Sequence, residues 1–157
     1  MLFTGKYDYS IDAKHRLAIP AKIRSRLGSR NVGTAFYAVI GPNGALWLWP
    51  EATFERMAGD IDATLAPPRP LMDFDEITFP EAQHVDLDTS GRVRIPEEML
   101  GKARLGSRVL ILGMRNHLEV WDPSRWEEHV GGKQANRSDI NQVAGPLLAG
   151  GNGAASA

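Results

Sequence analysis

The chain contains the same nine-residue signature twice, and this internal repeat constrains its fold more than any other feature. The signature reads Asp-x-x-x-Arg-x-x-Ile-Pro and occupies residues 12–20 and 88–96, at a constant offset of 76. A second match follows in the same order, because Leu-Trp-Leu-Trp at 46–49 aligns with Leu-Glu-Val-Trp at 118–121 at an offset of 72. Two anchors in one order indicate a duplicated structural unit, with a shorter connection in the second copy.

Each signature is predicted to join two short strands through a polar turn. The first strands are expected at 7–11 and 84–88, and the turns at 12–15 and 88–91. In the second strand, Leu17 and Ile19 fall on one face and Arg16 on the other, because side chains alternate along a strand. The second copy repeats this pattern with Val93, Ile95 and Arg92.

The proline that closes each signature is predicted to open a short helix of about two turns, since its missing N–H costs nothing there. These prolines are Pro20 and Pro96, and Gly28 or Gly106 can end the helices. Paired apolar strands are expected next, at 35–40 and 45–49 and again at 109–112 and 118–121. Further helices are predicted at 51–59 and 123–130, the latter capped by Asp122.

One copy has barely 45 residues, which is too few to bury a core of its own. The predicted fold class is therefore mainly β with short helices (α+β), in which two units complete one small barrel. The predicted boundaries are repeat 1 at 5–53, a connector at 54–81, repeat 2 at 82–124, a C-terminal helical segment at 125–148 and a disordered tail at 149–157. The Pro-rich, acidic part of the connector from residue 60 is expected to be an exposed loop, and disorder is expected from Gly131 on.

The charge of the chain is distributed very unevenly. The net charge of −1 and the pI near 6.4 argue by themselves against a nucleic-acid partner. Residues 1–30, however, carry seven Lys/Arg against two Asp/Glu, whereas residues 51–90 carry two against ten. The resulting net charges of +5 and −8 indicate a basic end suited to a polyanionic or acidic partner.

Composition excludes several classes of site. The chain has no cysteine, which rules out disulfides, thiolate metal sites and a cysteine nucleophile. Its first residues lack the apolar segment of a signal peptide, and no stretch approaches the roughly 18 apolar residues of a membrane span. We therefore expect a cytoplasmic protein with no membrane partner.

These motifs, together with Phe3-x-Gly5 and the closing Glu119-Val120-Trp121 followed by Trp126, closely resemble the MraZ family over about residues 1–130. MraZ proteins are bacterial transcriptional regulators with two tandem SpoVT-AbrB-type units. The resemblance implies pseudo-symmetric AbrB-like units of swapped-hairpin or double-psi type, a ring-like homo-oligomer, and binding to short repeated promoter sites before a division and cell-wall gene cluster. It also implies a nucleoid-associated protein without a cofactor.

Basic residues in and after the two boxes are the candidates for contact with DNA: Lys14, Arg16, Lys22, Arg24, Arg92 and Arg94. Lysines offer point charges, and arginines can make bidentate contacts to phosphate or guanine. The resemblance assigns the DNA contact of the first box to Arg16. Asp12 and Asp88, with Pro20 and Pro96, are expected to shape the turns. The alternative is a solvated turn in which Asp12 simply pairs with Lys14 or Arg16.

The chain departs from the family pattern at two turn positions. The family usually has glycine where His15 stands, so either the turn differs locally or His15 takes a left-handed conformation. Ser90 makes the second box less basic, and Glu97 and Glu98 after it would repel phosphate. We therefore predict that the first copy faces DNA and the second a neighbouring subunit, where Lys22 or Arg24 of one protomer meets Glu97 or Glu98 of the next. The helical segment that the family has between its repeats is also poorly represented in the Pro-rich stretch at 66–70.

Other chemistry-bearing residues favour plain structural roles. The four histidines lack the spacing of metal ligands, and the acidic residues at 73–76 lack the glycine and distal glutamate of a calcium loop, so no metal site is predicted. Of the pairs Trp47/Trp49 and Trp121/Trp126, at least one member each is expected in the barrel core rather than stacked on bases.

Three functions compete at this point. The leading prediction is a repressor or autoregulator that uses an oligomer to read repeated sites on double-stranded DNA. The second is an AbrB-like interaction module, such as an antitoxin that binds a protein through its tail. The third is an enzyme, for which the sequence offers no nucleophile, base and orienting residue together, so no catalytic residue and no small-molecule substrate are predicted.

Overall fold

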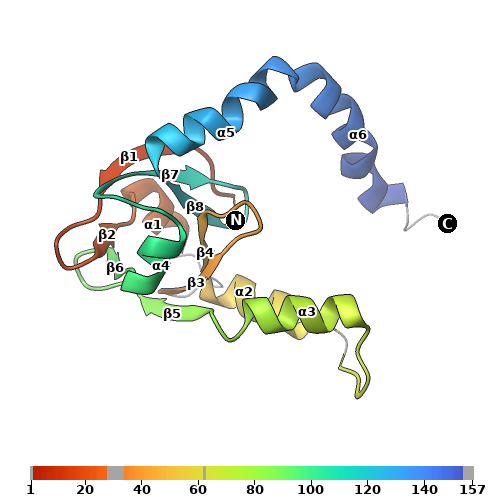
Figure 1. The fold of residues 1–157 in the computed structure, drawn as a ribbon, viewed down its shortest axis with the longest axis horizontal. Helices are drawn as coiled ribbons and strands as arrows, with labels where there is room; N and C mark the ends of the chain where they lie inside the picture. The colour runs from red at the N-terminus through yellow and green to blue at the C-terminus, as the bar shows by residue number, and fades with distance from the viewer. Residues whose placement is uncertain (1, 28–33, 62, 154–157) are drawn as a thin grey trace. The chain divides into compact units, whose positions relative to one another are not determined.

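The computed structural model describes residues 2–27, 34–61 and 63–153 of the 157-residue chain. Two compact units make up the chain, Met1–Asp122 and Pro123–Ala157, and each is described by itself. The first is a mixed α+β unit, in which an antiparallel sheet carries several short helices (Figure 1).

The first repeat follows the predicted order of elements. They are β1 (Lys6–Ser10), β2 (Arg16–Ala18), α1 (Ala21–Leu27), β3 (Ala35–Ile40), β4 (Leu46–Pro50) and α2 (Glu51–Gly59). The predicted strand at 35–40 and helix at 51–59 are confirmed with their bounds. Gly28, the expected end of the first helix, lies outside the described residues.

The second repeat has the same order of elements after an additional helix. They are α3 (Arg69–Thr78), β5 (Gln83–Asp86), β6 (Arg92–Arg94), α4 (Glu97–Lys102), β7 (Arg108–Gly113) and β8 (Leu118–Trp121). Helix α4 ends before Gly106, contrary to prediction. The left-handed residue just beyond the helix is Arg104, with a φ of 53°.

The two repeats are interleaved in one six-stranded sheet of order β1-β7-β8-β4-β3-β5. Strand β1 pairs with β7 of the second repeat, and β5 pairs with β3 of the first. The two hairpins meet where Leu46 of β4 lies opposite Val120 of β8. Because each repeat lends its first strand to the hairpin of the other, neither half has a complete sheet of its own.

The predicted closed barrel is not found in the described residues. Strands β2 and β6 form a separate two-stranded sheet, called here the β2–β6 ribbon, and β1 and β5 remain the edges of the large sheet. The short length of β2 and β6 explains the open sheet. Each strand has three residues, and the two strands pair with one another instead of with the large sheet. Short strands of this kind cover one face of the core without closing the sheet.

The core lies between one face of the large sheet, the ribbon and helices α1 and α4. The sheet contributes fully buried Phe36, Leu46, Leu48, Ile111, Leu118 and Val120; the boxes contribute Leu17, Ile19, Val93 and Ile95; the helices contribute Ile23 and Met99. Each such side chain stabilises the fold by about 1.5–3 kcal/mol relative to exposure. The apolar residues of each signature thus belong to the core, and they pack the ribbon against the sheet.

The connector contains a helix, so the prediction of an exposed loop is wrong for residues 69–78. Helix α3 begins at Arg69, and Pro70 occupies its first turn, where a missing N–H breaks no hydrogen bond. Leu71, Phe74 and Ile77 then recur at a spacing of three, which places them along one side of the helix. The prolines at 67, 68 and 70 therefore start a helix instead of preventing one.

The tryptophans of β4 do not enter the core, which corrects a second prediction. Trp47 and Trp49 are two residues apart, so both lie on the face opposite the core residues Leu46 and Leu48. Trp49 is nevertheless buried, as is Trp121 on the same face of β8. This second face of the sheet thus has aromatic cover of its own.

The C-terminal unit consists of α5 (Pro123–Ala135) and α6 (Arg137–Gly153). The disorder predicted from Gly131 on is therefore wrong as far as Gly153, since the backbone is helical there. The rest of the predicted disordered tail, residues 154–157, lies outside the described residues. In the described residues, no helix combines the length and apolarity that crossing a membrane requires.

Candidate functional site

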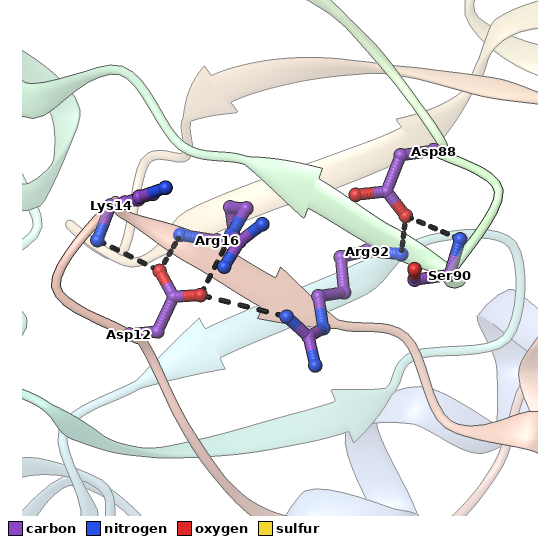
Figure 2. Close-up of polar contacts among 6 residues, drawn as sticks. All are labelled: Asp12, Lys14, Arg16, Asp88, Ser90 and Arg92. Carbon is purple, nitrogen blue, oxygen red and sulfur yellow. Dashed lines mark hydrogen bonds and ion pairs between the residues drawn. The ribbon is translucent and has the colours of Figure 1, made fainter.

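Both signatures fold into the same turn around an aspartate. Asp12 Oδ1 accepts hydrogen bonds from the backbone N–H groups of Lys14 and Arg16, both at 2.9 Å. Asp88 Oδ1 accepts the equivalent bonds from Ser90 at 2.8 Å and Arg92 at 3.0 Å (Figure 2). Each carboxylate therefore accepts hydrogen bonds from backbone N–H groups that lack a backbone acceptor in a tight turn.

The position before each box arginine has a left-handed backbone. His15 has a φ of 63° and Gly91, at the equivalent position, a φ of 77°. Of the two alternatives left open by the sequence, His15 therefore takes the left-handed conformation, at a steric cost that glycine avoids. Gly91 is also required for close packing, because a Cβ there would lie 2.8 Å from Cδ and Nε of Arg24.

Pairing of β2 with β6 brings the two boxes together. Leu17 lies opposite Val93, and both point into the core, while Arg16 lies opposite Arg94 and Ala18 opposite Arg92. Backbone bonds from Ile19 N to Gly91 O (2.9 Å) and from Ile95 N to His15 O (2.8 Å) extend the pairing at both ends. The box side chains that point away from the core share one face of the ribbon, called here the basic face, which carries Arg16, Arg92 and Arg94. Lys14 lies in the turn just before Arg16.

One carboxylate organises an arginine from each repeat on this face. Arg16 Nε donates to Asp12 Oδ2 at 2.8 Å, and Arg92 Nη1 lies 3.7 Å from the same oxygen (Figure 2). The backbone N–H of Arg16 holds the pKa of Asp12 below its usual value of 3.8; partial burial opposes this, and the Arg16 side chain adds to it. The aspartate is therefore ionised at neutral pH.

Helix α1 adds two further cations beside the ribbon. Arg24 Nε donates to the backbone carbonyl of Ile19 at 3.0 Å, which anchors this arginine against Gly91 of the second turn. Lys22 is exposed on the same helix. Arg24 thus joins the first repeat to the second box.

Pairing of β2 with β6 places Arg92 and Arg94 on the same face of the ribbon as Arg16. The contact of the second copy with a neighbouring subunit, through Glu97 or Glu98, stays a prediction. The acidic residues after the second box are also partly engaged within the chain. Lys102 Nζ donates to Glu98 at 2.9 Å and to Glu81 at 2.8 Å. These hydrogen bonds raise the pKa of Lys102, and the one to Glu81 lowers the pKa of that carboxyl.

A buried polar cluster on the second face of the sheet was not predicted from the sequence. Glu119 accepts hydrogen bonds from Asn43 (2.9 Å) and Trp121 (3.0 Å), and its other oxygen lies 3.0 Å from His117 Nε2. The imidazole of His117 is stacked on Trp47 and on Trp49, with centroid distances of 4.2 and 4.5 Å. The sequence does contain one sign of this cluster, because Glu119 interrupts the otherwise apolar strand β8.

Metal-binding groups of histidine, cysteine or carboxylate side chains are absent from the described residues. The polar clusters described above are ion pairs and hydrogen-bonded turns.

Comparison with known proteins agrees with the motifs. A family model described as "MraZ protein, putative antitoxin-like" matches residues 2–67 and 78–144. A "Transcriptional regulator MraZ" from Nocardioides sp. is 33% identical over 142 residues, covering 90% of this chain and 95% of the relative. One of the same name from Roseiflexus castenholzii is 31% identical over 146 residues, covering 93% and 99%. The chain therefore belongs to the MraZ family.

Proposed function

We propose that the chain is a sequence-specific, DNA-binding transcriptional regulator. The observation that carries the proposal is the basic face, where arginines from boxes 76 residues apart lie together on a two-stranded ribbon. The cations of α1, Lys22 and Arg24, extend this surface. The relatives' name, transcriptional regulator, supports the same function.

The basic face suits the major groove of duplex DNA, which admits a two-stranded β-ribbon. Arg16 uses Nε for Asp12, so its terminal nitrogens remain for a phosphate or for the O6 and N7 atoms of guanine. Lys14 and Lys22 act as point charges on phosphates, which position the ribbon without reading sequence. Asp12 and Asp88 keep the turns in shape, with Pro20 and Pro96 closing the boxes. No cofactor and no catalysed reaction are part of this function.

Assembly belongs to the same proposal. The two repeats are SpoVT-AbrB-type units related by approximate two-fold symmetry, and several copies form a ring-like homo-oligomer. Such an oligomer would bind several short promoter repeats at once, so that a few contacts per subunit add up through multivalency. The proposed outcome is repression of its own division and cell-wall gene cluster, by a protein of the cytoplasm that associates with the nucleoid. The opposite net charges of residues 1–30 and 51–90 support self-association.

Binding to a DNA fragment from upstream of its own gene, measured by fluorescence anisotropy at several salt concentrations, tests the function. The logarithm of affinity should fall steeply with that of salt, by about 0.9 per phosphate neutralised. Arg16→Ala should weaken binding at least about tenfold. Arg69→Ala on α3 is the matched control, because it removes the same charge from a side chain that is 84% exposed. Absence of binding at low salt would refute the proposal.

The antitoxin-type interaction module is the second candidate. The family description and the separate α5–α6 unit, which is suited to contact with a partner protein, favour it. This module predicts a partner that binds α5–α6 and no salt-dependent affinity for promoter DNA. The DNA titration above therefore separates the two candidates.

A further inference from the structure

Among the described residues, most of the exposed large hydrophobic side chains fall in two places. Four large hydrophobic side chains that are exposed by a third or more, Met57, Phe74, Ile77 and Phe79, line a groove on the first unit. Four others, Ile140, Val143, Leu147 and Leu148, belong to α6. Exposed apolar groups gathered in this way mark interaction surfaces rather than random exposure.

The groove has a volume of about 320 Å³ and lies on the second face of the sheet. Its floor is formed by Trp47 and Trp49 of β4, and its walls by α2 and α3, with Phe54 and Ile77 among the wall residues. Aromatic contacts hold the walls together, since Phe54 and Phe74 both pack against Phe79. This groove has the apolar lining that suits the apolar face of a helix.

Helix α6 presents a matching stripe. Ile140, Val143 and Leu147 are spaced by three and four residues, so they lie along one side of the helix, and Val143 and Leu147 are 72% and 76% exposed. No residue of α5 is buried either. Gly145 and Pro146 also lower the intrinsic stability of α6. Residues 123–148, the part of this unit whose burial is described, contain no buried side chain. Helices of low intrinsic propensity with no buried face gain their stability from packing against a partner.

Charge favours the same pairing. The sequence segment 51–79, to which both wall helices belong, carries seven Asp/Glu against two Lys/Arg. Glu55 and Glu76 are exposed on the wall helices. The α6 stripe is preceded by Lys133 at the end of α5 and by Arg137 at the start of α6, both exposed. An apolar stripe with cations at its leading end thus complements an apolar groove whose two wall helices carry exposed glutamates.

We propose that the groove between α2, α3 and β4 binds helix α6 of a second copy of this chain. Each copy then offers one groove and one helix, so the contact is head-to-tail and links one copy to the next, as a ring-like oligomer requires. Helix α5, with 13 residues, acts as a spacer of about 20 Å that carries α6. The inference rests on the self-association included in the proposed function, and it names the surfaces that associate.

The chain has no cysteine, so introduced cysteines can form disulfides only with one another. Full-length Ile77→Cys and full-length Val143→Cys are prepared separately, mixed under mild oxidation and followed on non-reducing gels, with the linked peptides identified by mass spectrometry. The mixed disulfide should form at least about tenfold faster than in the control mixture, because docking raises the effective concentration of the two thiols. The matched control is Ile77→Cys with Gln142→Cys, which lies on the opposite side of α6.

Light scattering of the unmodified chain separates this inference from the proposed function. If light scattering shows an oligomer but the mixed disulfide forms no faster than in the control, the groove assignment is wrong and self-association is still supported. If the chain is a monomer at every concentration, both the groove assignment and the proposed self-association are wrong. A variant that carries both Ile77→Cys and Val143→Cys gives a further check. If it forms the disulfide only within one chain and not between chains, the assignment is wrong, because the groove then binds the chain's own helix.

Discussion

Arg92 of the second box lies with Nη1 3.7 Å from Oδ2 of Asp12 in the first box. Asp12 therefore touches an arginine from each repeat, whereas the hydrogen bonds found for the Asp88 side chain come from the backbone of its own turn. The two turns are alike in backbone and unlike in side-chain contacts. This difference between two otherwise matched aspartates makes the role of the basic face testable.

Asp12→Asn should lower sequence discrimination while the turn is kept, because an asparagine Oδ1 accepts the same two backbone bonds. Without the carboxylate, Arg16 and Arg92 lose their common partner and adopt more orientations. The ratio of specific to non-specific DNA affinity should then fall about tenfold, the value of one well-placed base contact. Asp88→Asn removes an equal charge from the equivalent turn and should leave the ratio nearly unchanged. Equal effects of the two variants would contradict an orienting role for Asp12.

Arg92→Ala should weaken DNA binding by less than Arg16→Ala does. Arg16 has Lys14 beside it in its turn, whereas the corresponding position near Arg92 is Ser90 and the following helix begins with two glutamates. We expect Arg16→Ala to cost about 1–3 kcal/mol of binding free energy and Arg92→Ala about half of that. Anisotropy titrations of both variants at one salt concentration measure the difference. A larger loss for Arg92→Ala would show that the second box is the main contact.

Acid stability should depend on Glu119. Burial raises the pKa of its carboxyl, but hydrogen bonds from His117, Asn43 and Trp121 outweigh burial, so the pKa lies below its usual value of 4.5. A folded pKa below the unfolded one contributes stability above pH 4.5, and that stability is lost as the pH falls through the folded pKa. Glu119→Gln should lower the free energy of unfolding at neutral pH by about 2 kcal/mol.

Urea unfolding of Glu119→Gln at a series of pH values checks this dependence. Its stability should fall less steeply below pH 4.5 than that of the unmodified chain. Glu97→Gln, an exposed glutamate of α4, serves as the control and should keep the original slope. Parallel curves for the unmodified chain and Glu119→Gln would rule out Glu119 as a source of acid sensitivity.

His15 should tolerate glycine and reject β-branched residues, because its φ is 63°. His15→Val should destabilise the fold by about 1–2 kcal/mol. His15→Gly should change stability by less than about 1 kcal/mol, since relief of strain offsets the greater freedom of the unfolded chain. Gly91→Ala should cost more than His15→Gly, because its Cβ also meets Arg24. Chemical denaturation of the three variants gives the order, and a stabilising His15→Val would contradict the left-handed turn.

The residue pattern was sufficient for the local structure of the boxes. The alternation of Arg16, Leu17 and Ile19 predicted which side chains enter the core, and the structure confirms it. The hairpins and the short helices after Pro20 and Pro96 were predictable for the same reason, since periodicity, turn residues and proline act over a few residues. Helix α3 was missed because prolines that start a helix resemble prolines that exclude one.

The sequence by itself thus determined the repeat, its turns and its basic residues, because each depends on neighbours in the chain. Only the tertiary structure decided that β2 pairs with β6, that Arg92 reaches Asp12, and that the large sheet stays open. These contacts join residues about 76 positions apart, so no local pattern encodes them. Their register depends on burying Leu17 against Val93, which places the arginines of both boxes on a single face.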